Sequence, residues 1–126
     1  MKVHHIAISV KNLEKSAAFY KSNFGFEEMN RFTKTGWDGS AVVLKLDDLQ
    51  LEIFSFKSYI EKIDGLSDLK VIGLKHIGIH VANVNEKYME LKNKQIDIDE
   101  PVKGVTVAWF CFLRDPDGIP IEIIEP

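Results

Sequence analysis

The sequence has little of several features that mark specialised classes of protein. Its 126 residues include one cysteine, Cys111, so a disulfide within the chain is excluded. No apolar run approaches the roughly 18 residues needed to cross a bilayer, and the start shows no signal-peptide pattern. We therefore expect a cytoplasmic protein without membrane partners. Cys111 lies in the apolar run 107–112, which predicts a buried and unreactive thiol.

An excess of charge of either sign is also missing. The 16 basic and 19 acidic residues are interspersed and give a net charge of −3. Because a nucleic-acid surface normally needs a basic patch, we expect no nucleic-acid partner. The hydrophobic content of 45% and charged content of 28% are ordinary for a globular protein. This length allows one compact domain, or two half-domains with a shared core.

The sequence does contain an internal repeat with two copies. The stretch HHIAISVKNL at 4–13 recurs as KHIGIHVANV at 75–84, and a shift of 71 residues places His5 on His76. Two copies indicate a paired module, because a solenoid needs three or more repeats.

The ends of the two copies match as well. The stretch LEIF at 51–54 falls on IEII at 121–124 at a shift of 70 residues, which places Glu52 on Glu122. Each copy therefore opens with a histidine in a strand and closes with a glutamate in a strand. We interpret the chain as a single domain made of module one (1–56), a linker (57–72) and module two (73–126).

Local patterns predict the same order of elements in each module: strand, helix, strand, strand, strand. The evidence is period-two alternation in the strands, Asn12 and Asn83 as helix N-caps, and Gly25 as a helix C-terminal glycine. In module one we expect a strand at 3–10, a helix at 13–22, and strands at 27–33, 41–46 and 49–56. In module two we expect a strand at 74–81, a helix after Asn83, and strands at 96–98, 105–113 and 119–125, with a loop at 101–104. The linker is expected to hold a short helix near 59–63.

Histidine and glutamate at matching positions of the two copies are the candidate functional residues of this sequence. Imidazole nitrogen and carboxylate oxygen bind divalent transition metals. A pseudo-twofold pairing of the modules would bring one histidine and one glutamate from each copy together. Two imidazoles and two carboxylates leave open positions on a six-coordinate ion, which favours a catalytic site. The four candidate ligands are His5, Glu52, His76 and Glu122.

An alternative interpretation treats these residues singly. A lone histidine in a strand is usually a partly buried core residue, and a lone glutamate often faces solvent. The repeat favours the metal site, since both residue types recur at equivalent positions. His80 shares a face with His76, so it either enters the same cavity or packs in the core. Trp37 and Trp109 are likewise either cavity walls or plain core.

These residues resemble the vicinal oxygen chelate superfamily, which includes glyoxalase I. The resemblance rests on 5–20, 24–26 and 75–81, and most specifically on DPDGIPIE at 115–122. It implies an α+β fold of two tandem βαβββ modules that form a curved mixed sheet around a metal site. It also implies one divalent metal, nickel or zinc before cobalt, manganese or iron, held by the four candidate ligands.

The resemblance implies a metal-dependent lyase or isomerase that acts next to a carbonyl. The first expectation is a glyoxalase I-like conversion of the hemithioacetal of methylglyoxal to a 2-hydroxyacyl thioester, with Glu122 or Glu52 moving the proton. Ser9 stands where glutathione-dependent glyoxalase I has an arginine that grips the glutathione carboxylate, which puts glutathione itself in doubt.

Other functions within the same family stay open. The chain is alternatively an acyl-CoA epimerase, a thiol or epoxide-opening transferase, or a metal-free protein that binds and sequesters a small molecule. The expected partner is a small-molecule substrate, a thiol adduct or a thioester. A homodimer is a further expectation, and the four ligands come from one chain or from two.

Overall fold

The structure is a computed structural model that describes residues 1–61 and 65–126. The chain divides into two compact units, Met1–Glu61 and Lys62–Pro126. The boundary lies inside the predicted linker. The short helix predicted near 59–63 is wrong for 59–61, which have no helical structure, and the rest of that prediction lies outside the described residues.

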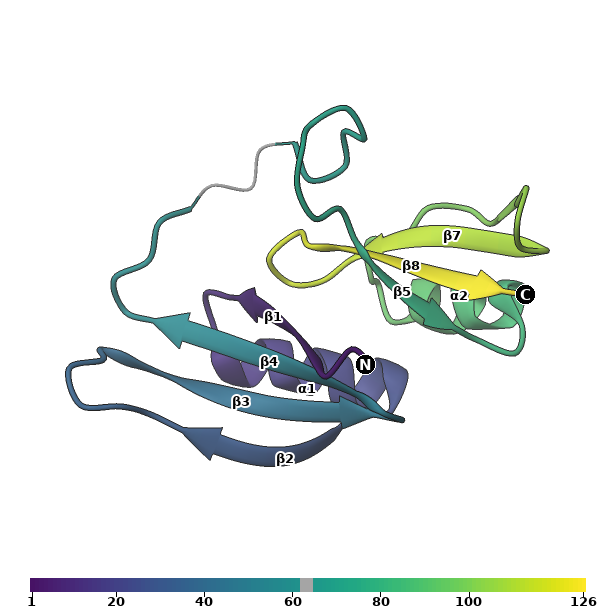
Figure 1. Cartoon of the computed structure of the whole chain (residues 1–126). Helices are drawn as coiled ribbons and strands as arrows, with labels where there is room; N and C mark the ends of the chain where they lie inside the picture. The colour runs from purple at the N-terminus through teal and green to yellow at the C-terminus, as the bar shows by residue number, and fades with distance from the viewer. Residues whose placement is uncertain (62–64) are drawn as a thin grey trace. The chain divides into compact units, whose positions relative to one another are not determined.

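Unit one is a four-stranded mixed sheet with one helix (Figure 1). Its strand order is β1-β4-β3-β2, in which β1 pairs parallel with β4 and the other pairs are antiparallel. The elements are β1 (His5–Ser9), α1 (Leu13–Phe24), β2 (Glu27–Phe32), β3 (Gly39–Leu46) and β4 (Leu49–Phe56).

Helix α1 covers one face of this sheet, over β3 and β4. The Asn12 side chain accepts a hydrogen bond from the Lys15 N–H at 3.0 Å, which confirms the predicted N-cap. The helix runs two residues beyond its predicted end and stops at Gly25, whose φ of 77° is the left-handed conformation that glycine tolerates. Ala17 and Tyr20 on the helix pack into the core, whose strand residues include Val42, Leu44, Leu51 and Ile53.

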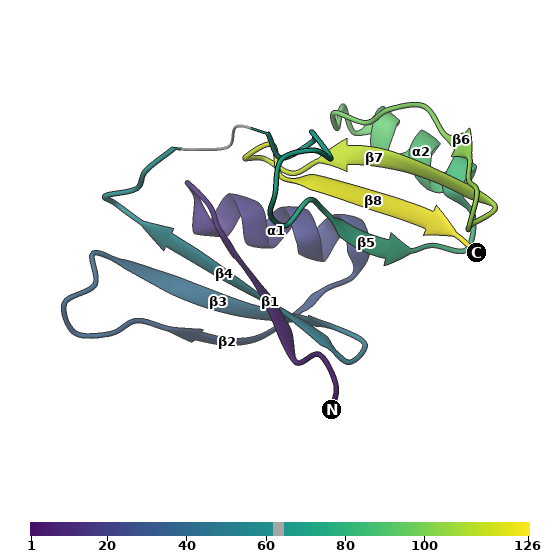
Figure 2. The same cartoon turned by 45° about the horizontal axis from the view of Figure 1, so that its top comes forward.

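Unit two repeats this design (Figure 2). Its strand order is β5-β8-β7-β6, with β5 parallel to β8 and the other pairs antiparallel. Helix α2 begins after Asn83, whose side chain accepts from the Glu86 N–H at 2.9 Å. The predicted apolar stripe of this helix, Val84, Tyr88 and Leu91, is buried. The elements are β5 (Ile77–His80), α2 (Val84–Asn93), β6 (Val102–Lys103), β7 (Trp109–Arg114) and β8 (Pro120–Glu125).

The sheet edge next to β7 differs from the prediction. The expected strand at 96–98 is reduced to one β-bridge between Ile98 and Leu113, whereas the expected loop at 101–104 contains β6. Pro101 separates the two, because proline has no N–H to donate to a ladder. The strand expected from residue 105 begins only at Trp109, since 104–108 form the turn between β6 and β7.

Both units therefore have the βαβββ order and the same strand order, and the predicted fold class is confirmed. In each unit the helix packs on one face of the sheet, and the opposite face carries both polar and aromatic side chains. Across the described residues, neither helix is long and apolar enough to cross a membrane.

Candidate active site

In unit one, His5 and Glu52 lie on the sheet face that is opposite the helix. The parallel register of β1 and β4 pairs Ala7 with Glu52, so His5 is two residues away on the same face. The His5 Nε2 and Glu52 Oε2 atoms are 3.5 Å apart. The two side chains are 48% and 20% exposed, which leaves the pair open to a ligand from solvent.

Unit two places His76 and Glu122 in the same relationship. Gly78 pairs with Glu122 across β5 and β8, and His76 again precedes the paired residue by two positions. The His76 Nε2 and Glu122 Oε2 atoms are 3.1 Å apart, with side chains 30% and 23% exposed. The repeat in the sequence is therefore a repeat of this local geometry.

The two pairs fit the requirements of a divalent metal. Imidazole nitrogen and carboxylate oxygen bind transition metals at about 2.0–2.2 Å. Two such ligands at a right angle around one ion are about 3 Å apart. The separations of 3.1 and 3.5 Å match this value, and each pair offers one nitrogen and one oxygen.

Each unit supplies two of the four predicted ligands. Within residues 1–61 and 65–126, no group of three or more His, Cys, Asp or Glu side chains is close enough to hold an ion. His5 and Glu52 belong to unit one, whereas His76 and Glu122 belong to unit two. The full four-ligand set stays a prediction.

The neighbours of the two histidines differ. His4 Nδ1 lies 2.9 Å from His5 Nδ1, which leaves Nε2 of His5 as the nitrogen that faces Glu52. In unit two, the ring of Phe112 meets the His76 ring edge-on, with ring centres 5.1 Å apart and an interplanar angle of 81°. Phe112 pairs with Glu122 in the β7–β8 register, so it lies on the same face as the pair.

The face that carries Glu52 also carries a cluster of aromatic rings. Trp37 contacts Phe32, Phe54 and Phe56 at ring-centre distances of 5.9, 5.9 and 5.0 Å, and all four side chains are half-buried. Of these rings only Trp37 was a sequence candidate. Phe54 follows Glu52 by two positions, so a period-two count along the strand identifies it as a neighbour on the same face.

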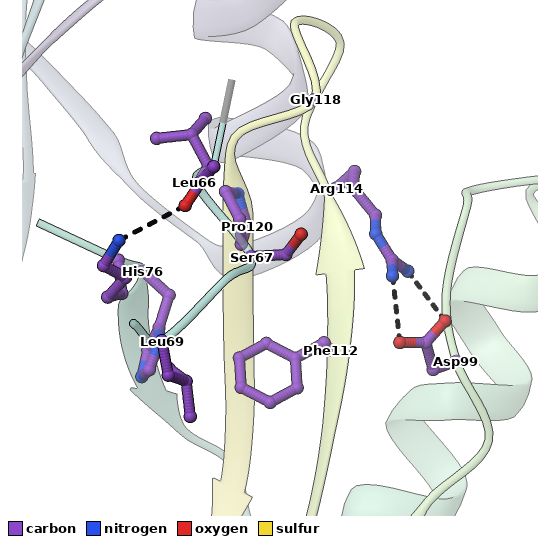
Figure 3. A pocket seen from close by; sticks show the side chains of 11 residues that line it. Leu66, Ser67, Leu69, His76, Asp99, Phe112, Arg114, Gly118 and Pro120 are labelled. Atoms are coloured by element: carbon purple, nitrogen blue, oxygen red, sulfur yellow. Dashed lines mark hydrogen bonds and ion pairs between the residues drawn. The ribbon is translucent and has the colours of Figure 1, made fainter. Parts of the chain in front are cut away.

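Unit two contains a pocket of about 380 Å³ that includes His76 (Figure 3). Figure 3 shows Leu66 and Leu69 from the segment before β5, Phe112 on β7, and Arg114 directed at Asp99. The segment before β5 was expected only as part of the linker. His80 is exposed and does not line this pocket, so it is not a core residue.

The lone cysteine has no part in this site. Cys111 is 1% exposed on the helix-facing side of β7. Burial raises the pKa of its thiol to about 11, so the nucleophilic thiolate is scarce at neutral pH. The predicted burial of the thiol is confirmed, and its low reactivity stays a prediction.

A family model named Glyoxalase/Bleomycin resistance protein/Dioxygenase superfamily matches residues 2–123. The chain belongs to this superfamily, the vicinal oxygen chelate superfamily. The human mitochondrial methylmalonyl-CoA epimerase is 35% identical over 97% of the chain and 72% of that protein. The uncharacterized protein YwkD of Bacillus subtilis (strain 168) is 31% identical over 98% of the chain and 95% of that protein. The crystal structure of SMU.1112c has a TM-score of 0.85 at 28% identity, over 99% of the chain and 98% of that structure.

Members of this superfamily include enzymes and are typically metal-dependent, in agreement with the donor atoms of the two His–Glu pairs. The predicted superfamily is thus confirmed, whereas the glyoxalase I-like subtype stays a prediction.

Proposed function

We propose that the chain is a metal-dependent enzyme that moves a proton on the carbon next to the carbonyl of a thioester or thiol adduct. The observation that supports this is the repeated pair of a histidine nitrogen and a glutamate oxygen, 3.5 Å apart in unit one and 3.1 Å apart in unit two. A divalent metal held by these residues supplies Lewis-acid polarisation of the substrate oxygens.

The carboxylates of Glu52 and Glu122 transfer the proton in this proposal. One carboxylate takes the proton from carbon, and the electron pair of the C–H bond moves into the adjacent carbonyl to give an enolate. Return of the proton to the same carbon from either face inverts or retains its configuration. Return to the neighbouring carbon, together with transfer of the hydroxyl proton to the former carbonyl oxygen, isomerises a hemithioacetal to a 2-hydroxyacyl thioester. Both side chains are half-buried, so bulk water competes less for the proton.

Epimerisation of an acyl thioester is the first candidate reaction. It is favoured by the 35% identity to the human epimerase over nearly the whole chain. Ser9 at the end of β1 also provides no cation for a glutathione carboxylate. The second candidate is the glyoxalase I-like isomerisation, favoured by the presence of a glutamate beside each histidine.

The test follows exchange of the α-proton in D₂O. Coenzyme A thioesters of 2-methyl-substituted acids and methylglyoxal with several thiols are incubated with protein loaded with nickel or zinc, and deuterium incorporation is read by NMR. We expect catalysed exchange in at least one series, and loss of at least about 100-fold in Glu122→Gln or Glu52→Gln. Retention of full activity in both variants would show that neither glutamate is the base.

A metal-free binding protein is a candidate from another class, and the aromatic cluster around Trp37 favours it. Half-buried rings on a sheet face can stack on an aromatic ligand. Quenching of tryptophan fluorescence by an aromatic drug at micromolar concentration, in protein stripped of metal and inactive in proton exchange, would support binding over catalysis.

A further inference from the structure

We infer that His4 is a positioning residue for the His5–Glu52 pair, because it accepts a hydrogen bond from the Nδ1–H group of His5. This bond fixes the proton of His5 on Nδ1. The other nitrogen, Nε2, then faces Glu52 with a free lone pair for a metal ion. The inference rests on the proposed function, since it treats His5 as a metal ligand, and it adds a residue outside the four proposed ligands.

The rings of His4 and His5 are in direct contact. Their Nδ1 atoms are 2.9 Å apart, which lies within the range of a hydrogen bond. The rings meet edge-on, with centres 5.2 Å apart and an interplanar angle of 85°. Two ring nitrogens at this distance share one proton, so one imidazole donates and the other accepts. The tautomer of one ring is therefore linked to the tautomer of the other.

The second nitrogen of His5 gives the direction of this bond. Its Nε2 atom lies 3.5 Å from Glu52 Oε2, which is longer than an ordinary N–H···O hydrogen bond. The contact to His4 is thus shorter than the contact to Glu52. A metal binds the ring nitrogen that carries no proton, and the hydrogen bond at the other nitrogen sets which one that is. For a ligand that binds through Nε2, the Nδ1–H group of His5 donates and His4 accepts.

The backbone explains why two consecutive side chains meet. Consecutive residues of a strand point to opposite faces of the sheet, but β1 begins at His5 and His4 precedes it. The carbonyl oxygen of His4 accepts a hydrogen bond from the Gln50 N–H at 3.2 Å. His4 is thus held beside β4 through its backbone, while its side chain does not follow the alternation of the strand.

Unit two has a different arrangement around its histidine. The repeat places Lys75 at the position of His4, and its ammonium donates to two backbone oxygens of the segment 65–68, at 3.2 and 3.0 Å. A lysine ammonium has no acceptor for an imidazole N–H. The His76 ring instead meets the ring of Phe112 edge-on. Packing therefore positions this histidine, whereas a hydrogen bond positions the one in unit one.

The first experiment measures zinc affinity by isothermal titration of the natural protein, His4→Phe and His4→Asn. Phenylalanine keeps an aromatic ring against His5 but has no acceptor, whereas asparagine keeps an acceptor oxygen. Loss of such a partner lowers metal affinity about 10–100-fold. We expect the lower end for His4→Phe, because His4 is exposed and water replaces part of the lost bond. His4→Asn should recover most of the affinity. Equal affinity in all three proteins, or an equal loss in both variants, overturns the inference.

The second experiment depends neither on metal nor on turnover. Histidine rings are labelled with ¹⁵N in the full chain, and their tautomers are identified by NMR in metal-free protein at pH 8, above the ordinary imidazole pKa of about 6.5. We expect the Nδ1–H form of His5 in the natural protein and in His4→Asn, and a mixture of both forms in His4→Phe. His76 is the internal control and keeps its signals in all three. The Nε2–H form of His5 in the natural protein overturns the inference.

The two experiments separate the role of His4 from the proposed function. If the natural protein binds no zinc but the tautomer of His5 depends on His4 as stated, the metal-dependent function fails and the positioning of His5 by His4 stands. If zinc binds and the tautomer of His5 is the same in all three proteins, the metal site stands and the positioning role fails.

Discussion

Gly78 lies directly opposite Glu122 in the parallel pairing of β5 and β8, and a Cβ atom at Gly78 would be 4.0 Å from Glu122 Oε2. Ala7 occupies the same position opposite Glu52 in unit one. Both carboxylates therefore face a residue with almost no side chain. This leaves space beside each carboxylate for the proposed metal ion and substrate.

We expect Gly78→Leu to weaken zinc binding at least about tenfold, because the new side chain occupies the space next to Glu122. Gly78→Ala is the matched control, since it reproduces the residue found in unit one and its Cβ makes only ordinary contact. Isothermal titration with zinc gives the affinities, and thermal unfolding shows that both variants fold. Zinc binding by Gly78→Leu that equals the natural protein would contradict an ion beside Glu122.

The metal content of the natural protein is expected to be about one transition metal per chain. His5→Ala and His76→Ala each remove one imidazole ligand and lower that content, as measured by inductively coupled plasma mass spectrometry on untagged protein. His80→Ala is the control, because His80 lies on the same face of β5 and outside the His–Glu pair. Removal of metal with a chelator should abolish proton exchange, and nickel or zinc should restore it. Equal loss of metal in His80→Ala would mean that the ligand set is wrong.

Asp115 is expected to stabilise the turn that precedes β8. Asp115 is 5% exposed, and its carboxylate accepts hydrogen bonds from the N–H groups of Asp117 and Ile119 at 2.8 and 2.9 Å. Asp115→Ala leaves these donors without this acceptor, so we expect the free energy of unfolding to fall by about 1–3 kcal/mol. Asp115→Asn keeps one acceptor oxygen and should lose less. Urea denaturation measures both, and equal stability of the alanine variant would show that the turn forms without this carboxylate.

Cys111 should react slowly in the folded protein. With a thiol pKa of about 11, about one thiol in a thousand is ionised at pH 8. The side chain is also buried, so reaction with Ellman's reagent should follow unfolding and become fast in guanidinium chloride. The reactive form increases as the pH rises toward this pKa. Fast reaction at pH 8 without denaturant would show that β7 opens to solvent.

Much of this fold was predictable because the repeat and the strand patterns agree. Along 3–10 the apolar residues Ile6, Ile8 and Val10 alternate with His5, so a period-two count places His5 on the face away from the helix, and the same count applies to His76. Glu52 and Glu122 were then paired with these histidines by the repeat alone. The structure adds the reason, which is that both parallel registers put the glutamate two positions along from its histidine.

The sheet edge and the pocket were not predictable in the same way. Ile96 and Ile98 alternate as a strand does, yet Pro101 breaks the edge and leaves a single bridge before β6. The segment 65–69 has no counterpart in module one, so the repeat gave no information about it. Its position depends on two hydrogen bonds from one lysine side chain to backbone oxygens, which leave no periodic pattern in the sequence.

Each unit holds two of the four proposed ligands, so a variant can be damaged in one unit alone. Two such variants can then be tested for whether they complement each other when mixed. A His5→Ala chain is damaged only in unit one, and a His76→Ala chain only in unit two. If each ligand set is built from one chain, a mixture of the two variants contains no intact set. If each set is shared between the chains of a dimer, a mixed dimer combines both lesions in one site and leaves the other site whole. Recovery of metal binding after the two inactive proteins are mixed and refolded would therefore reveal the shared arrangement.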